Sequence, residues 1–391
     1  SMEYLRDVVI VGGVRTAHGK FKGALFNTPA VELGGMAISA TLEQTGIDAS
    51  MIDEVIMGNV LSAGIGQHPA RQSSLKSGIP AAIPALTINK MCGSSMKAIM
   101  LAANSIRAKE SKIVMVGGME SMSRSPFTVA RAEDGKVSME KPIDSMWNDG
   151  LVDPLNGMVM AQTGNRIAEQ FGITREEADL FAIESHIRAH NAHKRGDFAE
   201  YHIPVEHENG VLQTDEGIRP QTSLEALAKL EPVFDENGIV TAGNASQISD
   251  GGAACLVMSR EKADELGLEA LATITGYCSV GIESADVMSA PIPTVQKLWK
   301  MLGRDGEKDY DLYEHNEAFA SACLGVMQEL GLKHEKLNVH GGAVAMGHPL
   351  GASGCRIVLA LIHALRRKGG KRGFATACLG GGMATAIEVE V

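Results

Sequence analysis

The stretch Met91-Cys-Gly-Ser-Ser-Met-Lys-Ala-Ile-Met100 runs from a turn of small, polar residues straight into a helical pattern. Its apolar face predicts a helix from Met96 to Lys109, and the apolar run at 113–117 predicts a buried strand after it. Strands are also predicted at 7–11 and 54–58, with a helix at 31–44 between them. This alternation favours an α/β fold with mostly parallel, buried sheets.

Two parts of the chain resemble each other. Residues 93–107 and 113–119 parallel residues 351–365 and 374–383: each pair holds a small-residue turn, an apolar helix, a strand and a Gly-Gly-Met turn. Residues 8–12 likewise resemble residues 272–276. Between about 120 and 245 charges and prolines interrupt the pattern, and 175–195 is predicted to be a charged, solvent-facing helix. We therefore expect two similar halves and an inserted segment.

Composition excludes several classes of protein. The net charge of −11 leaves no broad basic surface for nucleic acid. No stretch approaches the roughly 18 apolar residues that suggest a membrane span, and the start does not resemble a signal peptide, although Ser1-Met2 resembles a tag remnant. We expect a cytoplasmic protein, or one of the mitochondrial matrix if a transit peptide has been removed. The absence of Cys-x-x-Cys and His-Glu-x-x-His patterns predicts no structural zinc and no catalytic metal.

Two of the six cysteines stand in glycine-rich sequence. Cys92 is predicted at the start of a helix, where the macrodipole and free N–H groups favour a thiolate. Cys378 ends a predicted strand and leads into Gly380-Gly-Gly382, a turn whose N–H groups suit an oxyanion hole. A thiol there suits general acid–base work. The other four are predicted to be buried and inert: Cys255, Cys278, Cys323 and Cys355.

His348 is the candidate base. Pro349 restricts its backbone to extended conformations, so the imidazole is predicted to lie on a loop, where it can accept a thiol proton. Asn316 precedes a helical stretch and either caps that helix or holds a water or a carbonyl oxygen. The adjacent His315 could face either the site or solvent. The remaining histidines, such as His186, His190 and His193, are predicted to be solvated.

Four blocks together resemble the thiolase family along the whole chain. They are Asn89-Lys-Met-Cys-Gly-Ser-Ser-Met-Lys-Ala98, Asn-Glu-Ala-Phe at 316–319, Gly-His-Pro at 347–349 and Cys-x-Gly-Gly-Gly at 378–382. The resemblance implies two βαβαβαββ halves in layered α/β/α/β/α packing. It assigns residues 1–120 and 249–271 to the first half, 272–391 to the second, and 121–248 to an inserted loop domain for coenzyme A binding and oligomer contacts.

The resemblance also implies an activity, that of an acetyl-CoA C-acetyltransferase. Two acetyl-CoA would give acetoacetyl-CoA and CoA through an acetyl group on Cys92, with no cofactor besides these substrates and in a homotetramer. His348 would activate the thiol and, with a water held by Asn316, bind the thioester oxygen. Cys378 would move the substrate α-proton, and the N–H groups of Cys92 and Gly380 would form a second oxyanion hole. Substrate contacts implied in the same way are Ser246, Arg219, Met160, Met288 and Phe319.

One position departs from the family pattern. Bacterial biosynthetic relatives usually carry a His-Met pair in the loop domain, and here Val159 stands before Met160. This loss of a polar group leaves the chain-length and branch preference open. The alternatives to the implied activity are a degradative 3-ketoacyl-CoA thiolase of broader chain length, a decarboxylating ketosynthase, which the presence of Cys378 disfavours, and a non-catalytic acyl-CoA-binding scaffold.

Overall fold

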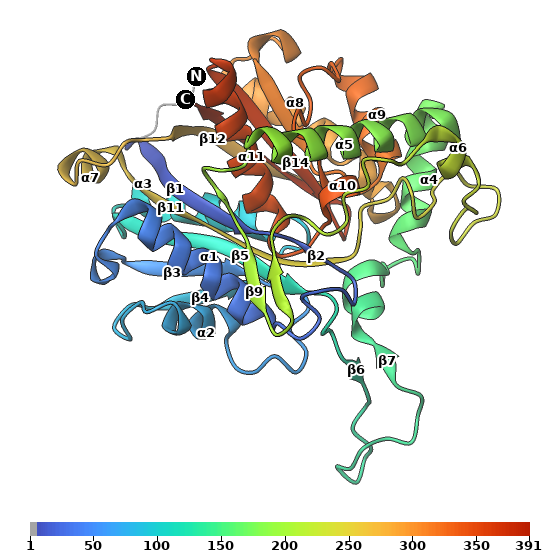
Figure 1. Cartoon of the computed structure of the whole chain (residues 1–391), viewed down its shortest axis with the longest axis horizontal. Coiled ribbons are helices and arrows are strands. Elements are labelled where there is room, and N and C mark those ends of the chain that lie inside the picture. Colours follow the sequence, from blue (N-terminus) through green and yellow to red (C-terminus); the bar gives the residue numbers. More distant parts are fainter. Residues whose placement is uncertain (1–5) are drawn as a thin grey trace.

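The computed structural model describes residues 6–391, so the predicted tag remnant lies outside the described residues. An 11-stranded sheet dominates this part of the chain, and its main path runs β13-β14-β15-β12-β1-β11-β5-β3-β4. Two short strands join it at the side, β2 (Gly19–Lys20) on β11 and β8 (His202–Ile203) on β1. Figure 1 shows the sheet between layers of helices.

The sheet consists of two halves with the same strand order. The first half runs β1 (Val8–Thr16), β11 (Ser249–Ser259), β5 (Ile113–Ser121), β3 (Glu54–Gly58) and β4 (Ala85–Ile88). The second runs β12 (Ala272–Gly281), β15 (Met383–Glu390), β14 (Arg372–Leu379) and β13 (Leu312–His315). A parallel bridge from Tyr313 to Leu337 stands where a fifth strand would follow. β1 and β12 join the halves through only two residue pairs.

Small details repeat between the halves as well. Asp53 accepts hydrogen bonds of 2.7 and 2.9 Å from the two backbone N–H groups where β5 starts, and Asp311 accepts bonds of 2.7 and 2.9 Å where β14 starts. The register slips just before Gly12 in β1 and just before Gly276 in β12. The predicted internal repeat is confirmed, because order, caps and bulges all recur.

The prediction of mostly parallel strands is wrong. β3 pairs parallel with β4 and β5, and β13 with β14, but β11 and β15 pair antiparallel with both of their neighbours. β14 and β15 are joined by a turn in which Gly381 and Gly382 have φ of 99° and 82°, a conformation that favours glycine. So tight a turn can join only antiparallel strands, and the alternation of strands and helices did not reveal it.

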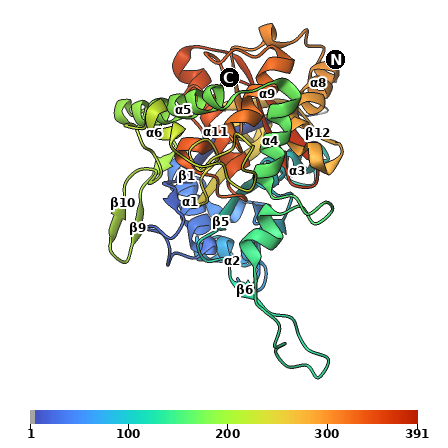
Figure 2. The same ribbon diagram turned by 90° about the vertical axis from the view of Figure 1, so that its right-hand side faces the viewer.

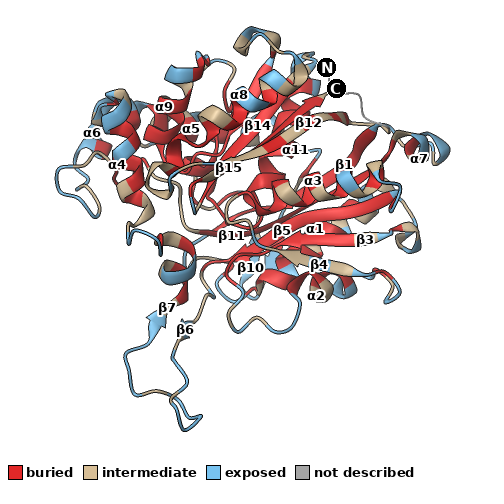
Figure 3. Ribbon diagram, turned by 180° about the vertical axis from the view of Figure 1, so that it is seen from behind, coloured by how far each residue is buried: buried red, intermediate tan, exposed pale blue. Residues whose placement is uncertain are grey.

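Five layers form around the two halves of the sheet. α3 (Ser94–Arg107) and α11 (Ser353–Lys368) lie between them, in one apolar cluster with residues of both. α1 (Ala30–Thr45) and α2 (Pro69–Lys76) cover the outer face of the first half, and α8 (Pro291–Leu302) and α9 (Ala320–Leu330) that of the second. α7 (Arg260–Glu265) follows β11. Figure 3 shows the strands buried between these helices, so the predicted layered fold is confirmed.

The chain between β5 and β11 forms its own group of elements. They are β6 (Phe127–Thr128), β7 (Ile143–Asp144), α4 (Met160–Phe171), α5 (Arg175–Arg195), β8, β9 (Val205–His207), β10 (Gly210–Leu212) and α6 (Leu224–Ala228). α5 has the predicted bounds but is not simply solvent-facing, because a stripe containing Ala182, Ser185 and Ala189 is buried. It lies against α9 and α10 (Ala343–Met346), and its buried side also includes Asp179.

The loop between β6 and β7 extends away from the body as an arm (Figures 1 and 2). Apolar side chains on this arm face solvent: Phe127, Val137, Met139 and Ile143 are 68%, 69%, 100% and 52% exposed. An arm with so much exposed apolar surface suits contact with another protein surface. Among residues 6–391, no helix has the length and apolar character needed to cross a membrane.

Candidate active site

His348 lies on the loop between α10 and α11, as predicted, and is buried. Its Nδ1 is 2.5 Å from Oγ of Ser353, and that hydroxyl also lies 3.1 Å from the carbonyl oxygen of Pro349. The hydroxyl has one hydrogen, so donating it to the carbonyl leaves Oγ to accept from Nδ1–H. Burial and the nearby Arg356 lower the pKa of His348 to about 3. The result is a neutral imidazole whose Nε2 carries no hydrogen and can act as an acceptor.

Asn316 faces that acceptor. It follows β13, and its amide Nδ2 lies 3.3 Å from Nε2 of His348. Its Oδ1 is buried without a hydrogen-bond partner, which leaves an acceptor for a small polar ligand. Asn316 is not the cap of the next helix, because α9 begins at Ala320 after Phe319. His315 is buried rather than solvent-facing: β13 is an edge strand, but Asn338 covers that edge by bonding both the backbone N–H and the carbonyl oxygen of His315.

Cys92 lies on the turn between β4 and α3, two residues before the helix begins, and is partly exposed. Burial raises the pKa of its thiol to about 12, although its own N–H and that of Gly380 stabilise the thiolate. The N–H groups therefore act in the expected direction, toward the thiolate, but burial has the larger effect. Loss of solvent outweighs the N–H groups, so Cys92 is a thiol at neutral pH and needs a base.

Cys378 lies near the end of β14 and is buried. Its Sγ is 3.6 Å from Sδ of Met288, and burial, followed by the nearby Cys92, raises its pKa. The electrostatic effect of Cys92 shows that the two sulfurs are close, although 285 residues separate them in sequence. The four cysteines predicted to be buried are buried, and all six are free thiols.

Cys92, His348, Cys378 and Gly380 line one cavity of about 60 Å³. The residues come from both halves of the fold and from the inserted segment, which contributes Met160 and Ser246. Two thiols and a neutral imidazole thus face one small space, together with the N–H groups of Cys92 and Gly380. This arrangement suits attack by a thiol on a carbonyl and stabilisation of the resulting oxyanion.

A larger cavity of about 430 Å³ adjoins the first. Both are lined by Leu151, Met160, Ser246, Phe319, His348 and Leu350. Of the other two predicted contacts, Arg219 lines the outer cavity and Met288 the inner one. Sequence reasoning missed Lys20, Trp147 and Phe234 in the outer wall. No local pattern marks these three, because they stand in different segments and meet only in the fold.

His186 is buried, contrary to the prediction that it is solvated. It lies on the buried side of α5, and its Nδ1 accepts a hydrogen bond of 2.9 Å from the backbone N–H of Arg219. Burial, followed by Arg219, lowers its pKa to about 4, so it stays a neutral acceptor. The ring therefore fixes the backbone of a residue that lines the outer cavity. His190 is exposed as predicted.

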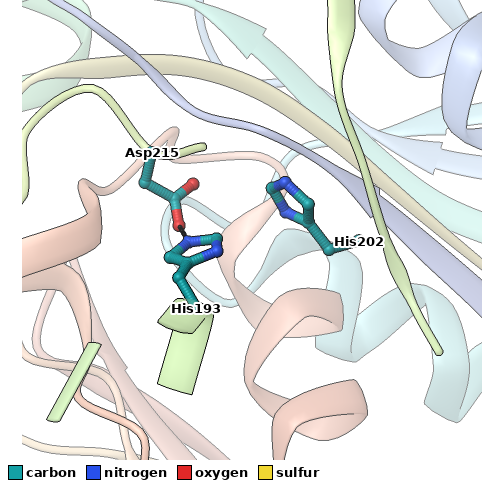
Figure 4. A group of neighbouring side chains, drawn as sticks. All are labelled: His193, His202 and Asp215. Carbon is teal, nitrogen blue, oxygen red and sulfur yellow. Dashed lines mark hydrogen bonds and ion pairs between the residues drawn. The ribbon is translucent and has the colours of Figure 1, made fainter. Parts of the chain in front are cut away.

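His193 is also not simply solvated, since its ring points at Asp215 with His202 nearby (Figure 4). The carboxylate of Asp215 accepts from Arg15 at 2.5 and 2.9 Å, from Nε2 of His193 at 2.8 Å and from the backbone N–H of His18 at 2.9 Å. Burial would raise the pKa of Asp215, but Arg15 and His193 hold it well below its ordinary value. With four donors the carboxylate is saturated, so this group ties the inserted segment to β1 and does not suit a metal.

The duplicated fold and the cysteine site define a class of acyl-transferring enzyme, and the comparisons give the family. The family model described as "Thiolase, N-terminal domain" matches residues 8–261, and "Thiolase, C-terminal domain" matches residues 268–391. The chain belongs to the thiolase family.

Similar proteins cover its whole length. The chain is 46% identical to an acetyl-CoA acetyltransferase of Cupriavidus necator, over 99% of this chain and 100% of that protein. It is 43% identical to a probable acetyl-CoA acetyltransferase of Escherichia coli, over 99% of each. Human mitochondrial 3-ketoacyl-CoA thiolase in complex with CoA superposes with a TM-score of 0.95 at 40% identity, covering 100% and 99% of the two chains. The Bacillus anthracis acetyl-CoA acetyltransferase has a TM-score of 0.95 at 38% identity, covering 100% of both.

Proposed function

We propose that this protein is an acetyl-CoA C-acetyltransferase that condenses two acetyl-CoA to acetoacetyl-CoA and CoA, reversibly. The observation that carries the proposal is the single cavity lined by Cys92, His348 and Cys378. The names of the relatives in Cupriavidus necator and Escherichia coli support the substrate. The reaction needs no cofactor besides the coenzyme A thioesters themselves.

The first half-reaction transfers acetyl to the enzyme. Nε2 of His348 takes the proton of Cys92, whose sulfur attacks the acetyl carbonyl. The N–H groups of Cys92 and Gly380 stabilise the oxyanion, as they stabilise the thiolate in the free protein. The carbon–sulfur bond to coenzyme A breaks, and Cys378 gives its proton to the departing thiolate. The products are acetyl-Cys92, free CoA, protonated His348 and the thiolate of Cys378.

The second half-reaction forms the carbon–carbon bond. The thiolate of Cys378 removes a proton from the methyl group of a second acetyl-CoA, and Asn316 and His348 hold its thioester oxygen as negative charge develops. The carbanion attacks acetyl-Cys92 and displaces its sulfur. Protonated His348 returns its proton to Cys92, so every group regains its starting state.

Cavity size supports a short acyl group. The inner cavity of about 60 Å³ is small beside the roughly 300–1,000 Å³ of ordinary ligand pockets, which suits a short acyl group. The outer cavity of about 430 Å³ is in the range of ligand pockets and suits the pantetheine arm. Arg219 and Lys20 line the outer cavity and suit the phosphates of coenzyme A.

Val159 lines only the outer cavity, so the missing histidine changes the wall beside the pantetheine arm and not the acyl end. A degradative role would need room for longer chains next to Met288. Thiolysis rates with 3-ketoacyl-CoA substrates of four to ten carbons separate the two activities. A rate that falls steeply beyond four carbons supports the proposal, and an equal or rising rate contradicts it.

The direct test is intact mass after brief exposure to acetyl-CoA. Native protein should gain one acetyl group, and the Cys92→Ser variant none. Acetylation of that variant at the same rate would reject Cys92 as nucleophile. Tight binding of acetyl-CoA without any acetylation of native protein would instead support a non-catalytic scaffold.

The exposed arm between β6 and β7 supports assembly into a homotetramer. Light scattering of the native protein should give four times the chain mass, and replacing Phe127 and Met139 by Ser should reduce it. A monomeric native protein would contradict this assembly. The bacterial sources of the relatives in Cupriavidus necator and Escherichia coli support a cytoplasmic location.

A further inference from the structure

Glu120 is the strongest candidate outside the reacting groups. It lies near the end of β5 and is completely buried. Its Oε1 accepts from the backbone N–H groups of Val60 at 3.0 Å and Gly351 at 2.9 Å, and its Oε2 from the N–H of Leu61 at 2.9 Å and Nδ2 of Asn59 at 2.9 Å. A carboxylate offers about four acceptor sites, so all are used.

The bond to Gly351 crosses between the two halves of the fold. Gly351 lies three residues after His348, in the second half, whereas Glu120, Asn59 and Cys92 belong to the first. One carboxylate thus binds the loop that carries the base to the half of the molecule that carries the nucleophile. Leu350, which lines both cavities, precedes Gly351 on the same loop.

The backbones of the loop and of the first half are in close contact at this point. A Cβ atom at Gly118 of β5 would lie 1.7 Å from the carbonyl oxygen of Gly351. A Cβ atom at Gly351 would lie 2.6 Å from the carbonyl oxygen of Met119 and 2.8 Å from that of Gly58. The loop rests directly on the ends of β3 and β5, and the Glu120 carboxylate holds it there.

The carboxylate also acts on the nucleophile. Glu120 is one cause of the raised pKa of Cys92, so its negative charge opposes a thiolate there. Burial raises the pKa of Glu120 itself to about 7, against the effect of its N–H donors. Such a carboxyl is costly to bury, and its charge disfavours the Cys92 thiolate. What it offers the reaction is therefore the placement of the loop that carries His348.

We propose that Glu120 is a positioning residue, which sets the distance between the base His348 and the nucleophile Cys92 by holding Gly351 against the first half of the fold. The inference rests on the proposed function. It assigns no contact between Glu120 and substrate. A displacement of about 1 Å in a reacting group costs up to about 100-fold in rate, so a clamp of this kind matters for turnover.

The test uses Glu120→Gln, which keeps the side-chain volume but leaves one acceptor oxygen. We expect kcat for acetyl transfer to fall by about 10- to 100-fold with KM within about twofold, because the base is displaced and the outer cavity is not. Alkylation of Cys92 by iodoacetamide, measured on the same variant, should not slow. Alkylation does not require an acyl donor aligned with the base. Removing the negative charge of Glu120 also lowers the pKa of the Cys92 thiol.

The matched control is Asp53→Asn, since Asp53 also accepts two backbone N–H groups, at the far end of the same strand. Its acetyl transfer should stay within about twofold of native. Gly351→Ala displaces the same loop with Glu120 intact and serves if Glu120→Gln does not fold. It should likewise slow acetyl transfer without slowing alkylation of Cys92.

Unchanged transfer in both Glu120→Gln and Gly351→Ala overturns the proposal. A parallel loss of transfer and alkylation also overturns it, because that result marks general disruption. Native protein that is never acetylated rejects the proposed function instead, and the alkylation comparison still reports the placement of Cys92.

Discussion

The amide nitrogen Nδ2 of Asn316 lies 3.3 Å from Nε2 of His348, on a loop 32 residues away in sequence. This contact keeps a donor, and no negative charge, beside the base. Asn316→Asp should therefore raise the pKa of His348, because a carboxylate favours the imidazolium form. We expect acetyl transfer to fall by roughly 10²–10³-fold, the usual cost of losing an oxyanion donor, and the acid limb of its pH profile to move to higher pH. The pKa of about 3 places the native limb below pH 5, so steady-state rates between pH 5 and 9 check this: the variant should lose rate toward pH 5 where native protein does not, and parallel profiles would contradict it.

The hydroxyl of Ser353 holds the ring of His348 through Nδ1. In Ser353→Ala the buried Nδ1–H loses its acceptor, which costs about 1–3 kcal/mol of unfolding free energy. Acetyl transfer should fall about tenfold, because a poorly oriented ring raises the activation free energy by about 1.4 kcal/mol. Ser95→Ala is the control, because Ser95 accepts a buried bond from the N–H of Cys355 at 2.8 Å without touching His348. Equal rate losses in the two variants would show that Ser353 acts only on stability.

The thiol of Cys92 should react with iodoacetamide at a rate that rises about tenfold per pH unit from pH 7 to 10. The reason is its pKa of about 12, which keeps the thiolate fraction proportional to hydroxide throughout this range. Rates from intact mass check the slope, with Cys92→Ser as the blank. A plateau near pH 8 would show that the thiolate is stabilised in the free protein.

Met288 closes the acyl end of the inner cavity against Cys378. Met288→Ala should extend this space and raise the relative rate of thiolysis for six- and eight-carbon 3-ketoacyl-CoA by about tenfold. Stability should fall by about 2–5 kcal/mol, the range for truncating a buried Met. Met301→Ala, in the same apolar cluster but in neither cavity, is the control. An unchanged chain-length profile would mean that another residue limits the chain.

Acid should destabilise the fold. Burial lowers the pKa of eight described histidines to about 3 or 4: His18, His186, His202, His315, His334, His340, His348 and His363. Between pH 6.5 and 4 the unfolded chain binds more protons at these sites, so their contribution to stability is lost as pH falls through that window. Burial raises the pKa of Asp250, Glu120 and Glu314 to about 6, 7 and 8, which stabilises the fold as pH falls but at fewer sites.

The net effect should be a lower free energy of unfolding at pH 5 than at pH 7.5, by up to about 1.4 kcal/mol per pH unit for each net proton, and with it a lower unfolding midpoint in urea. Urea titrations at both pH values, followed by circular dichroism, check the sign. A midpoint that rises at pH 5 would show that the buried carboxyls dominate.

Much of the local structure followed from residue patterns. α5 and β3 have the predicted bounds, and α3 begins two residues before the predicted Met96 and ends at Arg107, two residues early. The repeat was visible because residues 8–12 and 272–276 carry the same small-residue break, which the structure uses as a bulge. Such features depend on neighbours a few residues away, so a single sequence contains them.

The burial of individual side chains and the direction in which strands pair did not follow from residue patterns. His186 and Cys92 show why: the sequence suggests contact with water for the first and a stabilised charge for the second, but desolvation by other elements shifts the pKa of each toward its neutral form. The antiparallel pairing of β15 likewise depends on a glycine turn whose φ values no periodicity reveals.

By itself the sequence indicated which candidate groups the site contains and on which turns and strands they stand. Only the tertiary structure decided how far apart these groups lie, which of them carry protons, that all four acceptor sites of Glu120 are used, and how large the cavity is. Those quantities depend on solvent exclusion and on contacts between segments hundreds of residues apart, and both exist only once the two halves have packed around α3 and α11.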